Sequence, residues 1–269
     1  MQSVDPAVFA GGLVALLGVI VGSFLNALVW RIHKAIKIGG SARSQCPICE
    51  HTLAWYDLIP VVSWLVLRAH CRHCQEPISS QYPIVELLTG SLWLLSYLVL
   101  SPTSAIEYLQ IAVWLVALST LIALAVYDLR WMILPDKLVA VFVGSAAVYA
   151  ITGSLSGSST TLQQLDPLLG LISIAGLFYL IYQVSDGKWI GGGDVKLAVG
   201  LGLLLGLQGS LLALFIASLS GSIVGIFGII FLGKTRKDVI PFGPFLIAGT
   251  VFSFLFASTL IDWYFNQLI

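Results

Sequence analysis

The feature that most constrains this chain is its series of long apolar segments separated by short polar stretches. Only 10% of its 269 residues are charged, whereas a soluble domain carries about 25%. Segments of this length and polarity are typical of membrane-spanning helices, because a helix satisfies its own backbone hydrogen bonds in lipid. About eight such segments can be read, over residues 9–30, 84–100, 105–127, 138–152, 168–184, 195–207, 210–231 and 242–263. The sequence therefore predicts an all-α polytopic membrane protein with about eight transmembrane helices.

The distribution of charge along the chain predicts its topology. All 13 Lys and Arg residues fall on loops and segment ends that share one side of the membrane. The other side carries only acids, namely Asp5, Glu107, Asp166 and Asp262. Cytoplasmic loops are enriched in Lys and Arg, so we expect a periplasmic N-terminus. The first segment lacks a basic start and is long, which favours a retained span over a cleavable signal peptide. A formal net charge of zero gives no indication of a nucleic-acid partner.

The predicted cytoplasmic loop 31–83 holds all four cysteines in two C-x-x-C pairs, Cys46/Cys49 and Cys71/Cys74. This spacing is typical of a tetrahedral thiolate site for structural zinc. A reducing compartment disfavours disulfides; a redox couple or a mixed Cys/His ligand set remains an alternative. We therefore expect three parts: a first transmembrane helix (1–30), a zinc-binding loop domain (31–83) and a seven-helix membrane domain (84–269).

The same loop contains a run of apolar residues between the two cysteine pairs. We expect them either to lie against the membrane or to pack under the cysteines, and the sequence does not distinguish these two arrangements. The residues concerned are Leu58, Val61, Val62, Trp64 and Leu65.

Two acidic residues sit where predicted spans meet the cytoplasmic side. Asp128 ends the third span, where the helix dipole disfavours an anion, although pairing with Arg130 is an alternative reason for it. Asp194 begins the sixth span, whereas Asp136 follows a proline in the manner of a helix start. An ionisable group at a membrane boundary is a functional candidate. We expect Asp128 and Asp194 to form a catalytic pair that shares one proton, which leaves open which is acid and which is base.

Three consecutive glycines, Gly191, Gly192 and Gly193, precede Asp194. Such a run is costly in conformational entropy and allows another backbone to come close. We expect these glycines to bind an extended peptide substrate beside Asp194. Glu86, near the start of the second span, is expected either to meet a substrate amine or to pair with Arg31 or Lys37.

These motifs resemble those of a known family, the bacterial type IV prepilin peptidases. Gly191-x-Gly193-Asp194 resembles the G-x-G-D signature of intramembrane aspartyl proteases. The segment from Asp128 to Pro135-Asp136 is similar to the first aspartate motif of the family. Three further stretches agree: Gly22-Ser23-Phe24-Leu25-Asn26 with Arg31, Tyr82-Pro83 with Glu86, and Pro241-Phe242-Gly243-Pro244-Phe245.

The resemblance implies an endopeptidase of the bacterial inner membrane, with Asp128 and Asp194 as catalytic residues at the cytoplasmic face. Its implied substrates are prepilins or pseudopilins, with a basic leader and an apolar helix, cut after a glycine that Phe often follows. It also implies N-methylation of the new N-terminus with S-adenosylmethionine. Ala69 stands where the family has a glycine linked to methyl transfer. The alternatives are a proton-coupled transporter that uses both aspartates and a non-enzymatic scaffold.

Overall fold

A computed structural model of the chain describes residues 6–36, 43–155, 161–231, 233, 235, 238 and 240–268. Within these ranges the chain is helical, and the only β-contacts are two isolated bridges, Gln45 with Thr52 and His70 with Pro77. The predicted all-α class is confirmed. Some residues used in the charge argument lie outside the described ranges: Asp5, Lys37, Lys234, Arg236 and Lys237.

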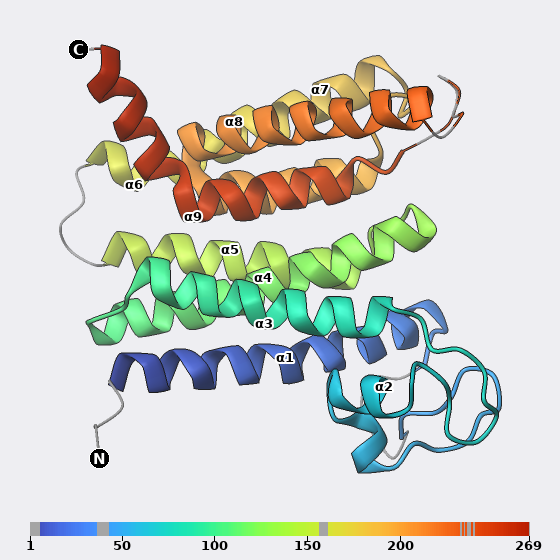
Figure 1. Ribbon diagram of the computed structural model, residues 1–269. Helices are drawn as coiled ribbons and strands as arrows, with labels where there is room; N and C mark the ends of the chain where they lie inside the picture. The colour runs from blue at the N-terminus through green and yellow to red at the C-terminus, as the bar shows by residue number, and fades with distance from the viewer. Residues whose placement is uncertain are drawn as a thin grey trace. The chain divides into compact units, whose positions relative to one another are not determined.

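The chain divides into two compact units, Met1–Ser101 and Pro102–Ile269. The first unit contains α1 (Pro6–His33), η1 (Trp55–Leu58), α2 (Val62–Val66) and α3 (Gln81–Leu100). Within it, α1 packs along α3, and the cysteine loop lies at the end of this helix pair (Figure 1). Gly22 permits the close approach of the helices, because a Cβ there would lie 2.7 Å from the Glu86 Cα.

The second unit contains the remaining helices. They are α4 (Ala105–Trp131), α5 (Asp136–Leu155), α6 (Thr161–Gly170), the π-helical η2 (Leu171–Ala175), α7 (Gly176–Val184), α8 (Gly192–Phe231) and α9 (Gly243–Leu268). Helix α4 packs against α5 and α9, and α8 packs against α5, α6 and α9. The core between α4 and α9 is apolar, with the rings of Trp114 and Phe254 stacked at 3.6 Å between centroids.

Seven helices among the described residues are long and apolar enough to cross a membrane. One of them, α8, has 40 residues. As a straight helix it would extend about 60 Å, at ~1.5 Å per residue, which is twice the thickness of a hydrocarbon core. The backbone of Gly206 leaves helical geometry, at φ 66° and ψ −169°. The chain reverses direction near this residue (Figure 1). Helix α8 therefore supplies two of the eight predicted segments, and the protein is a multi-pass membrane protein.

Asp166, on α6, stabilises this reversal in α8. The backbone N–H of Leu207 donates to Asp166 Oδ1 at 3.1 Å, and a Cβ on Gly206 would collide with the same carboxylate. The first N–H groups of a helix have no partner inside the helix, and a carboxylate supplies one. An acidic residue that counted only toward the charge pattern in the sequence thus has a defined structural role.

Candidate active site and cysteine centre

Asp128 lies in the last turns of α4 and is buried. The helix closes after Trp131, where Met132 adopts a left-handed conformation and donates its N–H to the Asp128 carbonyl at 2.8 Å. The Arg130 guanidinium lies over the Trp131 ring at 5.8 Å, and no ion pair in the described chain joins it to Asp128. Arg130 pairing therefore does not account for Asp128. Its carboxyl group instead accepts a hydrogen bond from the backbone N–H of Gly243.

Asp194 is the third residue of α8 and is half-buried. Its N–H donates to the Gly191 carbonyl at 3.0 Å, and its carboxyl group accepts the Gly191 N–H. The side chain thus caps the start of its own helix, as an acidic third residue does in a capping box. This capping holds the carboxyl group at the N-terminal end of α8.

Gly243, the first residue of α9, brings the two carboxyl groups into one site. A Cβ placed on Gly243 would lie against Asp128 Oδ2, 3.2 Å from Asp128 Cγ and 3.7 Å from Asp194 Oδ1. The end of α4 and the start of α8 therefore converge beside one glycine. The sequence alone indicated no role for Gly243, although its Phe-Gly-Pro context is among the stretches that resemble the family.

The three glycines before Asp194 differ in their surroundings. A Cβ on Gly193 would lie 3.1 Å from Leu134, whereas one on Gly192 would reach only Tyr182, at 3.7 Å. Gly191 is exposed, and a Cβ there would meet only Asp194 Oδ2, at 3.5 Å. Gly193 thus lets α8 pack closely against Leu134, whereas a Cβ on Gly191 or Gly192 would make only ordinary van der Waals contacts.

Asp136 and Lys196 form an exposed ion pair at 2.6 Å between the first turns of α5 and α8. Asp136 is the first residue of α5, and Pro135 accepts the first hydrogen bonds of that helix. Asp136 therefore has a structural role at the start of α5 and is separate from the Asp128–Asp194 pair.

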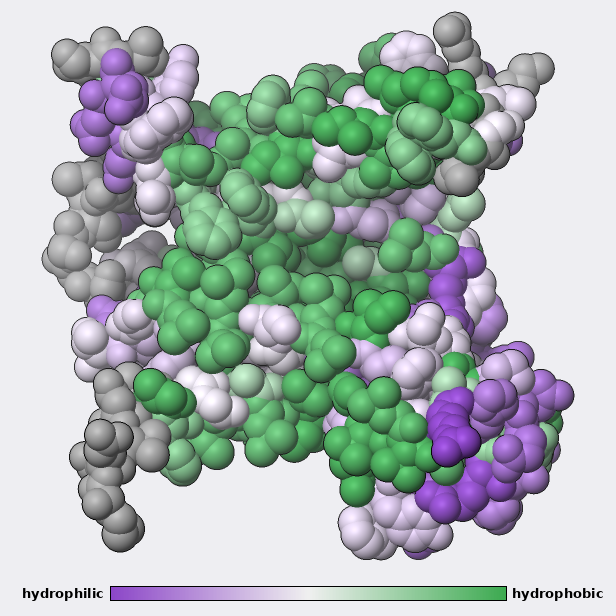
Figure 2. Space-filling model, viewed as in Figure 1, coloured by the Kyte–Doolittle hydropathy of each residue, from purple (hydrophilic) through white to green (hydrophobic). Residues whose placement is uncertain are grey.

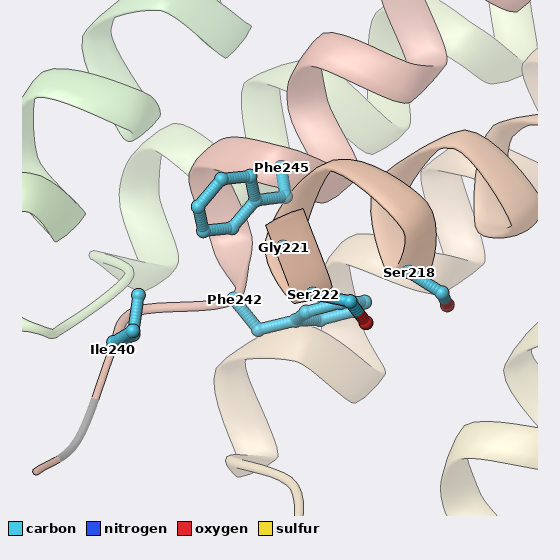
Figure 3. Close-up of a pocket in the computed structure, with 6 residues that line it drawn as sticks. All are labelled: Ser218, Gly221, Ser222, Ile240, Phe242 and Phe245. Carbon is cyan, nitrogen blue, oxygen red and sulfur yellow. The ribbon is translucent and has the colours of Figure 1, made fainter. Parts of the chain in front are cut away.

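A cavity of about 370 Å³ lies between α8 and the segment that leads into α9 (Figure 3). Ser218, Gly221 and Ser222 line it from α8, and Ile240, Phe242 and Phe245 line it from the other side. Phe242 immediately precedes Gly243, so this mainly apolar cavity adjoins the residue that contacts both carboxyl groups.

The four cysteines of the loop gather into one cluster. The sulfur atoms of Cys46, Cys49, Cys71 and Cys74 all lie within 4.8 Å of one another, and the Cys46 and Cys74 sulfurs are 3.9 Å apart. None of the four forms a disulfide. The loop thus has a set of four thiols that could hold a metal ion.

The two cysteine pairs have the same backbone structure. In each, the N–H of the first cysteine donates to the carbonyl of the residue five positions later, and the residue after the second cysteine has a positive φ. These hydrogen bonds run from Cys46 N–H to the His51 carbonyl at 3.0 Å and from Cys71 N–H to the Glu76 carbonyl at 2.8 Å. The left-handed residues are Glu50 and Gln75. Backbone N–H groups of Cys74 and His73 lower the pKa of Cys71 to about 7, whereas the pKa of Cys74 in the same cluster is raised to about 12. Cys71 is therefore the more readily ionised of these two thiols.

Ala69 has a φ of +62°, in the left-handed region that favours glycine. Its neighbour Arg68 is also left-handed, at +50°. The backbone at this position has the geometry that suits the family's glycine, and the chain adopts it with an alanine.

Glu86 is buried at the start of α3, where it accepts the backbone N–H of Val61 at 2.7 Å. No ion pair among the described residues reaches this carboxylate, and Lys37 lies outside them. Glu86 therefore ties the loop to the helix pair.

Comparison with known proteins agrees with this arrangement. Residues 16–100 match the model of the bacterial peptidase A24 N-terminal domain, and residues 115–226 match that of the type IV leader peptidase family. No solved structure gives a significant match.

Several curated proteins are similar over most of the chain. A protein of Xanthomonas campestris is 31% identical over 276 residues, covering 92% of each chain. One of Aeromonas hydrophila is 29% identical over 280 residues, covering 96% of this chain and 94% of the relative. One of Myxococcus xanthus is 36% identical over 218 residues, covering 81% and 63%. Each is named prepilin leader peptidase/N-methyltransferase.

Proposed function

Because this chain belongs to the type IV leader peptidase family, we infer that it is a membrane-embedded aspartyl endopeptidase that removes the leader peptide of type IV prepilins or pseudopilins. The observation that carries the proposal is the convergence of Asp128 and Asp194 at Gly243. The carboxyl groups come from two helix ends, the end of α4 and the start of α8, and they meet at the glycine that begins α9; helix packing alone does not require this meeting. They match the requirement of aspartyl proteolysis.

In the proposed reaction the pair shares one proton. The ionised carboxylate removes a proton from water as that water attacks the scissile carbonyl. The protonated carboxyl group donates a hydrogen bond to the carbonyl oxygen and stabilises the tetrahedral intermediate. Collapse of the intermediate breaks the C–N bond, and a proton passes to the leaving amine. Gly191, Gly192 and Gly193 are proposed to bind the extended substrate, for which the exposure of Gly191 beside Asp194 is support.

The cavity beside Phe242 is proposed to receive the apolar side chain that follows the scissile bond. Its lining by Phe242, Phe245 and Ile240 suits an aromatic or aliphatic group. Its position next to Gly243 supports a location for such a group beside the reacting carbonyl. This supports substrates whose apolar helix begins directly after the cut.

We propose that the N-terminus is periplasmic and that the catalytic pair faces the cytoplasm. The support is the one-sided distribution of Lys and Arg. A prepilin with a basic leader and an apolar helix would present its cut site at this same face of the bacterial inner membrane.

The four thiols are proposed to hold a structural zinc ion. With Zn–S bonds of ~2.3 Å, a tetrahedral site separates its sulfurs by about 3.8 Å, close to the Cys46–Cys74 separation of 3.9 Å. Cys46, Cys49, Cys71 and Cys74 would be the ligands, and the ion would stabilise a loop that has little core of its own.

A second proposed activity is methylation of the new N-terminus, with S-adenosylmethionine as donor and the loop 31–83 as the region involved. The names of the relatives support it. Mass spectrometry of processed pilin tests it separately from cleavage. Normal cleavage with an unmethylated N-terminus would remove the second activity alone.

The main test is incubation of the purified full-length protein with a prepilin. Wild type should shorten the substrate, whereas Asp128→Asn and Asp194→Asn should each reduce cleavage to background with an unchanged unfolding temperature. Asp136→Asn is the matched control, since this acid starts a neighbouring helix and should retain cleavage. Near-normal cleavage by either catalytic variant would refute the proposed pair.

A further inference from the structure

A run of large apolar side chains is exposed on the loop between the two cysteine pairs. No residue of η1 or α2 is buried. Trp55 is 77% exposed and Val66 is 70% exposed. The loop apolar patch consists of Trp55, Tyr56, Leu58, Ile59, Val62, Leu65 and Val66. Figure 2 shows this part of the loop, around α2, as an apolar area beside the hydrophilic outer part.

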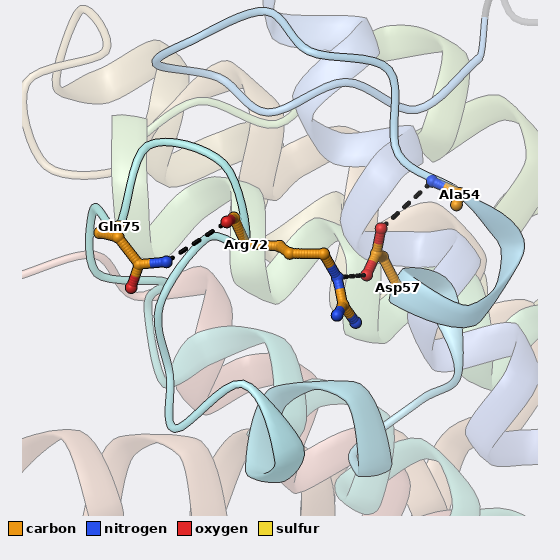
Figure 4. A network of polar contacts seen from close by, with 4 residues as sticks. All are labelled: Ala54, Asp57, Arg72 and Gln75. Atoms are coloured by element: carbon orange, nitrogen blue, oxygen red, sulfur yellow. Dashed lines mark hydrogen bonds and ion pairs between the residues drawn. The ribbon is translucent and has the colours of Figure 1, made fainter.

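Three contacts hold this segment from its inner side. The Arg72 Nε donates to Asp57 Oδ1 at 3.0 Å, and the Asp57 side chain is only 4% exposed (Figure 4). The Val61 N–H donates to Glu86, and the Trp64 Nε1–H donates to the Ile78 carbonyl at 3.1 Å. The exposure of the patch is therefore set by the fold of the loop, which turns its polar groups inward and its apolar groups outward.

The loop keeps this orientation even though the backbone of Val61 is strained. It has a φ of +61°, which is an outlier for a β-branched residue. Its N–H is the one that Glu86 accepts, so the buried carboxylate of α3 holds the strained turn directly before α2. The patch is thus tied to the end of a membrane-spanning helix.

We propose that the loop apolar patch lies on the surface of the lipid bilayer. Contiguous apolar surface of this kind is rare in contact with water and indicates a partner. The loop leaves α1 and enters α3, so lipid is the apolar phase already present at both of its ends. Ile84 and Leu87, in the first turns of α3, are also exposed, which continues the apolar surface from the span.

The composition of the patch and its surroundings matches a membrane interface. Trp and Tyr are enriched at the level of the lipid headgroups, where one part of the ring is apolar and another is polar. Arg68 is exposed on the same loop, and a cation beside an apolar segment attracts anionic headgroups. The bilayer contact holds the cysteine cluster at the membrane surface, independently of which reaction the protein catalyses.

Photo-crosslinking in bilayers tests the proposal with the full-length protein. A benzoylphenylalanine at position 65 or 66 is compared with one at position 76, which is exposed beside the second cysteine pair. The protein is placed, one copy each, in nanodiscs of phosphatidylethanolamine and phosphatidylglycerol. The expected result is a several-fold excess of lipid adducts at positions 65 and 66, with metal content equal to that of wild type.

Equal lipid labelling at the three positions would overturn the proposal. The proposal would also be overturned by a different result in vesicles that contain several copies of the chain together with a prepilin. That result is crosslinking of positions 65 and 66 to a second copy of the chain or to the prepilin. The wild-type protein supplies a readout that needs no substitution in α2. Headgroup-proximal brominated lipids should quench part of its tryptophan fluorescence, and Trp55→Phe should reduce the quenched fraction. An unchanged quenched fraction in Trp55→Phe would count against the bilayer contact.

Discussion

The backbone of Gly243 lies against the carboxyl group of Asp128, with its N–H donated to that group and no room for a side chain between them. This contact joins the start of α9 to the end of α4. The same glycine lies beside Asp194, so its size sets how closely the two acids approach.

Gly243→Ala should therefore reduce cleavage by about 100-fold, because a displacement of ~1 Å in a catalytic group has that effect. The unfolding temperature should change little, since the added methyl group displaces one side chain and leaves the packing of α9 intact. Cleavage of a prepilin and thermal unfolding in detergent measure the two quantities.

Gly144→Ala is the control for this variant. Gly144 lies in α5, where an added Cβ has no neighbour within 4 Å. It should keep full activity and gain up to about 1 kcal/mol of helix stability. Full activity of Gly243→Ala would show that the carboxyl groups do not depend on this contact.

Gly221→Leu should fill the cavity beside Phe242, because a Cβ at this position already lies 3.6 Å from Phe245. Cleavage of a substrate with Phe after the scissile bond should slow by about tenfold or more, as expected when a pocket is blocked. A substrate with Ala at that position should be affected less. Gly144→Leu serves as the control, and an equal loss for both substrates would assign the cavity a purely structural role.

Zinc removal should unfold the loop while the helices persist. Cys49→Ser or Cys74→Ser should lose the metal, as measured by mass spectrometry of metals, and should make the loop sensitive to protease. Zinc retention should also fall as the pH falls, because the thiolates take up protons.

The adjacent histidines provide the control for the metal site. The ring centroids of His51 and His73 lie 3.5 Å apart, and the ring planes are tilted by 34°. We expect His51→Ala and His73→Ala to retain zinc, since four sulfurs complete the coordination. Loss of metal in either histidine variant would indicate a mixed ligand set.

Ala69→Gly should stabilise the loop by about 1 kcal/mol, because glycine adopts a positive φ without the steric cost that alanine bears. Denaturant-induced release of zinc, followed with a chromogenic chelator, reports on this stability. Ala54→Gly, in the same loop at a φ of −79°, should bring no gain. Equal effects of the two substitutions would contradict a strained backbone at position 69.

Much of this architecture follows from local pattern. The apolar segments predict the spans because burying a helix in lipid depends mainly on its own length and polarity. The spacing of the cysteines predicts their cluster because a C-x-x-C turn places two sulfurs on one ion whatever lies around it. The Gly-Gly-Gly-Asp run predicts a helix start with an acidic first turn, and α8 begins in that way.

Other features depend on contacts between residues far apart in the chain. The sequence did not indicate that Gly243 would meet Asp128, that Asp166 would cap the break at Gly206, or that Glu86 would accept the Val61 N–H. It also left open whether the apolar residues near α2 pack inward or outward. By itself the sequence determined the membrane class, the number of crossings and the chemical groups available, because these follow from hydrophobicity and short-range spacing. Only the tertiary structure decided which groups meet, since helix packing brings together residues that no local pattern relates.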